Sequence, residues 1–306
     1  MSGDLLRVDL AGLSLANPTM LASGILGYTA VTLETVAKGG AGAVVTKSVG
    51  LKRRKGYANP TVVQTDCGLV NAMGLPNPGI DEFENEIREA KATLNVPLIV
   101  SLYGFSAEEY ATVASKAVIA GADAVELNVS CPHVKETGSE IGQDSRVLGE
   151  VVREVKNRVR KPVFVKLSPN VTDVTEIAEA AVRAGADGLT VMNTVKAMAI
   201  DVETALPILA NRVGGLSGKA IRPIAVRHIY DVCEHVKVPV VGCGGVEDWR
   251  DAVEFILAGA SAVQIGTAVA TEGPSVFRQV AKGIDTYLKR KGFKSVKDVV
   301  GLSHRH

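Results

Sequence analysis

Short apolar runs alternate along the chain with segments whose apolar residues recur at helical spacing. Four of the runs follow the sequence Gly-Ala-x-Ala or Gly-Ala-x-Gly, at residues 40–46, 121–127, 185–191 and 259–265. In each, the glycine can end a helix in the left-handed conformation, and the β-branched residues that follow can begin a strand. The repeated pattern predicts a series of helix-to-strand units.

Four further strands complete the pattern. Three of them are expected at Val96–Val100, Lys161–Val165 and Val238–Val241, each with a proline near its start. Proline is tolerated at the first residue of a strand because its missing N–H costs no ladder bond there. An opening strand is expected near Pro18–Ala22. Eight short apolar strands separated by helical segments predict an α/β fold, the TIM (β/α)8 barrel, as a single domain over residues 1–306.

Several helices and an N-terminal hairpin are expected around these strands. Helical periodicity is clearest at 107–120, 147–159 and 175–184, and Ser106 is a candidate N-cap for the first of these. Side chains of two kinds alternate along residues 5–15 on either side of Ala11-Gly12, as they do in strands. This pattern predicts a β-hairpin that plugs the bottom of the barrel.

Three connections are longer than ordinary turns. They are residues 49–78, 131–146 and 194–220, and each leaves the carboxyl end of a predicted strand. Long loops in compact domains are usually functional or mobile, and TIM barrels place their sites at this face. We therefore expect extended loops around a site there, with residues 131–146 acting as a lid that excludes water.

Composition and charge limit the classes of partner. Hydrophobic residues make up 46% of the chain and aromatic residues only 4%, which suits parallel strands covered by helices. The 34 basic and 33 acidic residues give a net charge of +1. The chain therefore has no overall positive electrostatic field that would attract nucleic acid or an anionic membrane. The basic cluster Lys52–Lys55 is interpreted as a solvated loop. With no apolar run of about 18 residues and no signal sequence, a soluble cytoplasmic protein is expected.

The four cysteines form no C-x-x-C pair and have no histidine at zinc-finger spacing. No metal site, disulfide framework or iron–sulfur cluster is therefore expected from them locally. Cys233 and Cys243 are interpreted as buried strand or helix residues, and Cys67 and Cys131 lie in predicted loops. If electrons leave this protein through such a cluster, another chain must carry it.

Polar side chains and glycines follow most of the apolar runs. Two of them are lysines, Lys47 and Lys166, which a barrel mouth would desolvate unless an anion or a polarised ligand were present. Gly244-Gly245 and Gly266-Thr267 follow the last two strands, where TIM barrels commonly bind phosphate through backbone N–H groups. The full set of strand ends is Ser23-Gly24, Lys47-Ser48, Ser101, Asn128, Lys166, Asn193-Thr194, residues 242–245 and Gly266-Thr267.

The stretch Asn128-Val129-Ser130-Cys131-Pro132-His133 presents an amide, a hydroxyl and a thiol directly after an apolar strand. The pKa of a free thiol is roughly 8.5, and nearby cations can lower it toward neutral, so that the thiolate can act as a base. We interpret Cys131 as a catalytic base. His133 is interpreted as a solvent-facing loop residue, with a role in lowering the thiol pKa as the alternative.

Six motifs together resemble the class 1 dihydroorotate dehydrogenases and cover nearly the whole chain in the order of that family. Residues 214–218, followed by 221–227, and residues 77–79 look more like the NAD-dependent type 1B catalytic subunit than the fumarate-using type 1A. The six motifs are residues 71–79 (NAMGLPNPG), 128–132 (NVSCP), 166–170 (KLSPN), 191–194 (VMNT), 214–218 (GGLSG) and 242–245 (GCGG).

The resemblance implies an FMN enzyme that oxidises dihydroorotate to orotate in de novo pyrimidine biosynthesis, leading to UMP. Cys131 would take the C5 proton while hydride leaves C6 for flavin N5. The implied substrate residues are Lys47, Asn71, Met73, Gly74, Leu75, Asn128, Asn193 and Thr194. The implied FMN residues are Ser23, Lys47, Ser48, Ser101, Asn128, Lys166, Val191, Gly218, Gly244, Gly245, Gly266 and Thr267.

The resemblance also implies partners. The type 1B catalytic subunit forms a homodimer and works with a second subunit that carries FAD and a [2Fe-2S] cluster, giving a heterotetramer that passes electrons to NAD. Three departures from the family occur near the site. Ser101 stands where related bacterial chains often have asparagine, Leu102-Tyr103 replace smaller residues, and His133 replaces a common asparagine.

Three alternatives are kept beside this interpretation. A fumarate-using type 1A enzyme would share the site, and a dihydropyrimidine dehydrogenase-like flavoprotein would act on uracil or thymine. Those pyrimidines lack the carboxylate for which Lys47 and the Asn71 segment are suited. A non-catalytic phosphate-binding barrel that serves as a scaffold would bind no flavin.

Overall fold

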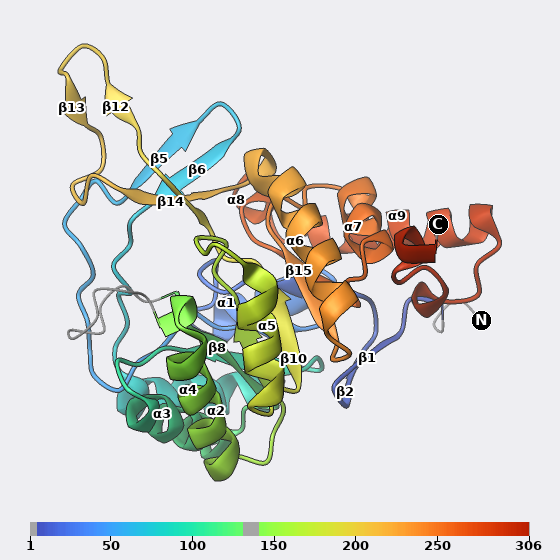
Figure 1. Cartoon of the computed structure of the whole chain (residues 1–306), viewed down its shortest axis with the longest axis horizontal. Coiled ribbons are helices and arrows are strands. Elements are labelled where there is room, and N and C mark those ends of the chain that lie inside the picture. Colours follow the sequence, from blue (N-terminus) through green and yellow to red (C-terminus); the bar gives the residue numbers. More distant parts are fainter. Residues whose placement is uncertain (1–4, 131–140, 306) are drawn as a thin grey trace.

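The barrel closes through contacts between its first and second strands. The computed structural model describes residues 5–130 and 141–305, and eight parallel strands follow one another in the order β3-β16-β15-β10-β9-β8-β7-β4. Met20 of β3 also pairs with Ala43, just before β4, and the Leu21 N–H donates to the Ala43 carbonyl over 3.1 Å. This contact brings the two edges of the sheet together, and the predicted TIM barrel is confirmed (Figure 1).

The barrel strands are short and almost completely buried, as strands covered on both faces must be. Every strand predicted from the sequence is present. Their bounds are β3 (Thr19–Leu21), β4 (Val44–Val45), β7 (Leu98–Leu102), β8 (Ala124–Asn128), β9 (Val163–Lys166), β10 (Gly188–Val191), β15 (Val240–Cys243) and β16 (Ala262–Ile265).

Helices surround the sheet, and their apolar faces pack on its outer side (Figure 1). None of those formed by the described residues combines the length and apolar character needed to cross a membrane. Their bounds are α1 (Ala30–Lys38), α2 (Ile80–Thr93), α3 (Ala107–Ala120), α4 (Ser145–Arg158), α5 (Val174–Arg183), α6 (Arg222–His235), α7 (Trp249–Leu257), α8 (Ala268–Glu272) and α9 (Val276–Lys291).

Helix starts depend on polar caps as well as on apolar periodicity. The predicted α3 is confirmed in both bounds, and the Ser106 side chain accepts from the Glu109 N–H. Helices α4 and α5 begin two residues and one residue before their predicted starts because Asp144 and Asp173 cap them, accepting backbone N–H groups of the first turn. The periodicity of apolar residues locates the first side chain of a helix that packs on the core. It does not locate the polar capping residue at which the helix begins.

The four helix-to-strand junctions have the predicted backbone. Each junction glycine has a positive φ angle, which side-chain-bearing residues rarely adopt. The angles are 106° at Gly40, 120° at Gly121, 104° at Gly185 and 118° at Gly259.

The N-terminal hairpin closes the bottom of the barrel. Strands β1 (Val8–Leu10) and β2 (Leu13–Leu15) pair antiparallel around the predicted turn. Leu10 and Leu15 are completely buried and pack in one apolar cluster with barrel residues such as Phe164. The predicted plug is confirmed.

Two of the long connections contain strands, which their sequences had not indicated. They supply a four-stranded sheet in the order β11-β14-β6-β5, and a separate hairpin is formed by β12 and β13. Figure 1 shows this sheet and hairpin projecting from one side of the barrel, with β1 and β2 on the other. The bounds are β5 (Val62–Thr65), β6 (Gly68–Asn71), β11 (Val195–Ala197), β12 (Ile200–Asp201), β13 (Leu206–Pro207) and β14 (Gly214–Ser217).

Candidate active site

Hydroxyl groups join the carboxyl ends of three neighbouring strands. The Ser48 hydroxyl lies 3.3 Å from the Ser23 hydroxyl and 2.9 Å from that of Ser101. It also accepts a hydrogen bond from Asn128 Nδ2 at the end of β8, over 3.1 Å. The sequence placed these four residues at separate strand ends, and the barrel brings them into contact.

Amide groups extend this network to the end of β10. Asn193 Nδ2 donates to Asn128 Oδ1 over 3.2 Å and to the Ser130 hydroxyl over 3.0 Å. Asn193 Oδ1 accepts from the Thr194 N–H over 2.8 Å, and the Tyr110 hydroxyl donates to the Asn128 carbonyl over 2.8 Å. The Asn128 and Asn193 side chains are thereby held in fixed orientations.

Asn71 reaches this region from the four-stranded sheet. Its Nδ2 donates to the Gly215 carbonyl of β14 over 3.2 Å. A side chain at Gly215 would place its Cβ 2.0 Å from Thr194 Oγ1, so glycine is required for this close approach. Asn71 and Thr194 therefore both adjoin Gly215 of β14.

Lys47 is a buried cation beside the same strand ends. Its exposed fraction is 8%, and its Nζ lies 4.0 Å from the position that a Cβ would occupy on Gly24. Burial lowers the pKa of its ammonium group, and no carboxylate of the described residues offsets that effect. A buried cation without a counter-ion favours binding of an anion.

Lys166 belongs to a different polar cluster, inside the barrel. Its Nζ donates to Gln264 Oε1 over 3.0 Å and lies 4.0 Å from Glu126 Oε1. Glu126 Oε2 accepts from Gln264 Nε2 over 2.6 Å and from Thr190 Oγ1 over 2.9 Å. Burial acts to lower the pKa of Lys166, but the adjacent Cys243 and Glu126 outweigh that effect and the pKa is raised.

Glu126, Gln264 and Thr190 were not predicted as site residues. All three are at most 1% exposed. The signal was present in the sequence, because Glu126 and Gln264 each interrupt an otherwise apolar strand. A charged or amide side chain in the middle of such a strand must point into a polar interior or carry a partner.

The glycines after β15 and the threonine after β16 meet at one place. A Cβ on Gly245 would lie 2.8 Å from the Gly218 carbonyl, and a Cβ on Gly218 would lie 3.3 Å from Thr267 Cγ2. Within the described part of the chain, no backbone carbonyl accepts from the N–H groups of Gly244, Gly245 or Thr267. Such unpaired N–H groups suit an anion such as phosphate.

Residues 73–75 lie on a tethered loop between β6 and α2. The Met73 carbonyl accepts from the Tyr57 N–H over 3.0 Å, and the Gly74 carbonyl accepts from Arg54 Nε over 2.8 Å. Val191 is fully buried at the end of β10, and Gly266 directly follows β16. The predicted site residues on or just after the barrel strands therefore lie at its carboxyl face.

Comparison with known proteins identifies the family. The family described as dihydroorotate dehydrogenase matches residues 5–288 of this chain. The chain belongs to the dihydroorotate dehydrogenase family.

Its relatives within the family include archaeal proteins of nearly equal length. A protein of Pyrococcus furiosus named dihydroorotate dehydrogenase B (NAD(+)), catalytic subunit, is 51% identical over 300 residues, which cover 98% of this chain and 99% of the relative. Proteins with the same name from Pyrococcus abyssi and Methanocaldococcus jannaschii are 52% and 48% identical, each over 98% of this chain and over 99% and 98% of the relative. The predicted resemblance to the type B catalytic subunit of this dihydroorotate dehydrogenase family is confirmed.

Cys131, the predicted base, and its neighbour His133 lie outside the described residues. Most of the predicted lid, residues 131–146, lies outside them as well. Of the other cysteines, Cys67 is exposed, Cys233 is half-buried in α6 and Cys243 is buried at the end of β15. Burial raises the pKa of the Cys233 thiol to about 12. Residues 5–130 and 141–305 contain no group of three or more His, Cys, Asp or Glu side chains arranged to hold a metal ion.

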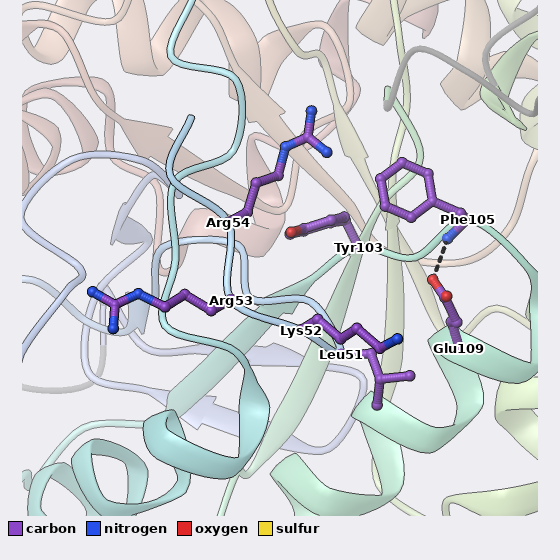
Figure 2. A pocket seen from close by; sticks show the side chains of 7 residues that line it. All are labelled: Leu51, Lys52, Arg53, Arg54, Tyr103, Phe105 and Glu109. Atoms are coloured by element: carbon purple, nitrogen blue, oxygen red, sulfur yellow. Dashed lines mark hydrogen bonds between the residues drawn. The ribbon is translucent and has the colours of Figure 1, made fainter. Parts of the chain in front are cut away.

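Three residues of the basic cluster Lys52–Lys55, namely Lys52, Arg53 and Arg54, line a small cavity of about 160 Å³ with Tyr103, Phe105 and Glu109. Figure 2 shows the charged groups of Lys52, Arg53 and Arg54 pointing in different directions. They do not converge on a common anion, and most of this cluster is solvent-exposed. The interpretation of this segment as a solvated loop is confirmed.

Proposed function

We propose that this chain is the catalytic subunit of a type B dihydroorotate dehydrogenase, which oxidises dihydroorotate to orotate in de novo pyrimidine biosynthesis. A single FMN-binding domain over residues 1–306 is part of this proposal. Membership of the dihydroorotate dehydrogenase family and the names of the relatives support the reaction.

One observation of the site supports dihydroorotate as the substrate. Lys47 is a buried cation without a counter-ion among the described residues, and it adjoins the fixed amides of Asn128 and Asn193 through Ser48. Dihydroorotate offers one carboxylate and a ring of alternating N–H and carbonyl groups. A cation pairs with the carboxylate, and asparagine side chains supply both donors and acceptors to the ring. Uracil and thymine would leave the Lys47 charge unpaired.

The residues present fit FMN. The unpaired N–H groups of Gly244, Gly245 and Thr267 suit its phosphate, and Lys166 offers a buried cation that would stabilise the negative charge of reduced flavin. When bound, FMN supplies the hydride acceptor. The remaining proposed FMN contacts are Ser23, Lys47, Ser48, Ser101, Asn128, Val191, Gly218 and Gly266.

The proposed roles of the other side chains follow from their positions. Asn71, Asn128, Asn193 and Thr194 would orient the ring, and the loop segment 73–75 would close one side of the substrate. Cys131 would remove the proton from C5, which leaves a C5–C6 double bond once hydride departs from C6. Asn128, Asn193 and Ser130 form the fixed frame at the end of β8 from which the chain leads to Cys131.

Anaerobic reduction of the purified protein tests this function. We expect a yellow protein with FMN released on denaturation, and bleaching of the flavin by dihydroorotate but not by dihydrouracil. Preferential bleaching by dihydrouracil would support the dihydropyrimidine dehydrogenase-like alternative. A colourless protein would support the scaffold alternative, and rapid reoxidation by fumarate would support type 1A.

Replacing Lys47 by alanine should weaken orotate binding by about 10- to 100-fold, the loss expected for a hydrogen bond to a charged group. Burial lowers the Lys47 pKa from 10.5, and only the protonated form attracts the carboxylate. Orotate binding to the wild-type protein should therefore weaken as pH rises through that lowered value. Titrations of flavin absorbance with orotate at several pH values measure both effects.

The control for this titration is Lys38→Ala, which removes an exposed ammonium on α1. It should bind orotate as the wild type does. An unchanged dissociation constant in Lys47→Ala would remove Lys47 from the substrate site.

Replacing Gly245 by alanine should weaken FMN binding by about 10-fold or more, because a side chain at positive φ costs about 1–2 kcal/mol. The φ angle of Gly245 is 87°, and the added Cβ would also lie 2.8 Å from the Gly218 carbonyl. Gly292→Ala is a matched control, with a φ angle of 76° and no atom within 4 Å of the added Cβ. Fluorescence titration of apoprotein with FMN measures the difference, and equal FMN affinity in the two variants would argue against the phosphate site.

We further propose a homodimer of this chain, joined to a second subunit with FAD and a [2Fe-2S] cluster in a heterotetramer that reduces NAD. The words "catalytic subunit" in the names of the relatives support a partner. Large apolar side chains are exposed on and beside the β12–β13 hairpin, including Ile200 (56%), Val202 (86%) and Leu206 (62%), and such patches commonly mark interfaces. Native mass measurement of the chain purified from its source, with NAD reduction by dihydroorotate, tests the assembly.

A further inference from the structure

Asn77 is the most fully hydrogen-bonded side chain of the loop between β6 and α2. Its Oδ1 accepts from the N–H groups of Gly50 and Gly79, over 3.2 and 2.9 Å. Its Nδ2 donates to the Leu75 carbonyl over 2.9 Å and to the Tyr103 hydroxyl over 2.7 Å. With an exposed fraction of 5%, this amide uses both donor hydrogens and accepts two bonds, which is its full capacity.

The backbone that Asn77 holds adopts an uncommon conformation. Leu75 has a φ angle of 57°, in the left-handed region that costs a side-chain-bearing residue about 1–2 kcal/mol. Such a conformation persists where surrounding contacts fix it, and these residues cluster at functional sites. Here the Leu75 carbonyl is fixed by Asn77, and the Pro76 carbonyl accepts from the Tyr28 hydroxyl over 2.5 Å.

Tyr103 connects this loop to the barrel. It directly follows β7, its exposed fraction is 2%, and its N–H donates to the Val49 carbonyl over 3.0 Å. A Cβ on Gly50 would lie 2.5 Å from Tyr103 Cζ, so the ring packs closely against the segment that leaves β4. Figure 2 shows the Tyr103 hydroxyl turned away from Phe105 and toward the segment that carries Arg53 and Arg54.

We propose that Tyr103 and Asn77 are positioning residues for substrate binding. The bond between them ties the loop to the strand that also carries Ser101, which contacts the Ser48 and Asn128 network. It thereby sets the distance between residues 73–75 and the polar network at the strand ends. The inference rests on the proposed function, since it concerns how the dihydroorotate site is assembled.

Tyr103→Phe removes the hydroxyl and keeps the ring. We expect the dissociation constant of orotate and the KM for dihydroorotate to rise about fivefold, the change that corresponds to loss of one buried hydrogen bond of about 1 kcal/mol. FMN content and kcat should stay close to those of the wild type, because no group that contacts the flavin is altered. Amide hydrogens of residues 71–79 should exchange faster in the substrate-free variant.

Asn77→Ser is the second variant. It loses the donors to both Leu75 and Tyr103, so the increase in the orotate dissociation constant should exceed that of Tyr103→Phe. Tyr287→Phe, on α9 and outside the site, is the control and should match the wild type in orotate binding, melting temperature and hydrogen exchange.

The outcomes separate this inference from the proposed function. Unchanged orotate binding and unchanged exchange of residues 71–79 in Tyr103→Phe, with normal turnover of dihydroorotate by the wild type, would overturn the positioning role alone. A fall in kcat with an unchanged KM would also overturn it, because positioning of the substrate loop acts on binding. Failure of the wild-type protein to bind orotate would overturn both.

Discussion

Replacing Cys131 with alanine is expected to leave FMN bound and to slow its reduction by dihydroorotate by about 10²–10⁴-fold, the usual contribution of a positioned general base. The reaction requires a proton to leave C5, which is a carbon acid adjacent to a carbonyl. Without a base at that position, water must take the proton, and the hydride donor is correspondingly poorer. Stopped-flow bleaching under anaerobic conditions measures the rate.

The described residues around this position support the assignment. Ser130 precedes Cys131 and accepts a hydrogen bond from Asn193 Nδ2, which also donates to Asn128. The chain therefore enters residue 131 from a fixed point beside the proposed substrate amides. None of the other cysteines offers an alternative base, because Cys233 and Cys243 have pKa values raised by burial and Cys67 lies exposed in the β5–β6 turn.

Cys131→Ser provides the comparison for the alanine variant. A hydroxyl is a poorer base than a thiol, so this variant should work slowly, with its activity displaced to higher pH. FMN content should be equal in all three proteins. Bleaching of Cys131→Ala at the wild-type rate would exclude Cys131 as the base.

The fold could be predicted from the sequence because its signals are local and repeated. Glycines that end helices, prolines that open strands and uninterrupted apolar runs each act within a few residues, and eight such units permit one closed arrangement. The four-stranded sheet could not be predicted in the same way. Its strands are short, are rich in glycine as at Gly214-Gly215, and pair β6 with β14 across more than 140 residues of intervening chain.

Site residues could be predicted where a polar side chain lies at the end of an apolar strand. Ser48, Asn128 and Asn193 follow apolar runs, and parallel strands bring their carboxyl ends to one face. Side chains that act through other residues were missed. Asn77 lies in a loop whose path depends on distant contacts. Glu126 interrupts an apolar strand, which indicates a polar partner, but only the folded barrel shows that Lys166, Gln264 and Thr190 surround it.

Removing the charge of Glu126 is expected to destabilise the protein more than any other substitution considered for the barrel interior. Glu126→Leu leaves Lys166 as a buried cation without its carboxylate, and it deprives Gln264 and Thr190 of their acceptor. Breaking a buried ion pair in this way costs about 3–5 kcal/mol. The urea concentration at the unfolding midpoint of the apoprotein measures the loss.

The double variant Glu126→Leu with Lys166→Met tests whether charge is the cause. Removing both partners leaves no uncompensated ion, and replacement of a buried pair by apolar side chains is often neutral or stabilising. The double variant should therefore be more stable than Glu126→Leu alone, although it should bind FMN more weakly because Lys166 is absent. A double variant as unstable as the single one would show that Glu126 acts through Gln264 and Thr190, and that the 4.0 Å approach of Lys166 contributes little to folding.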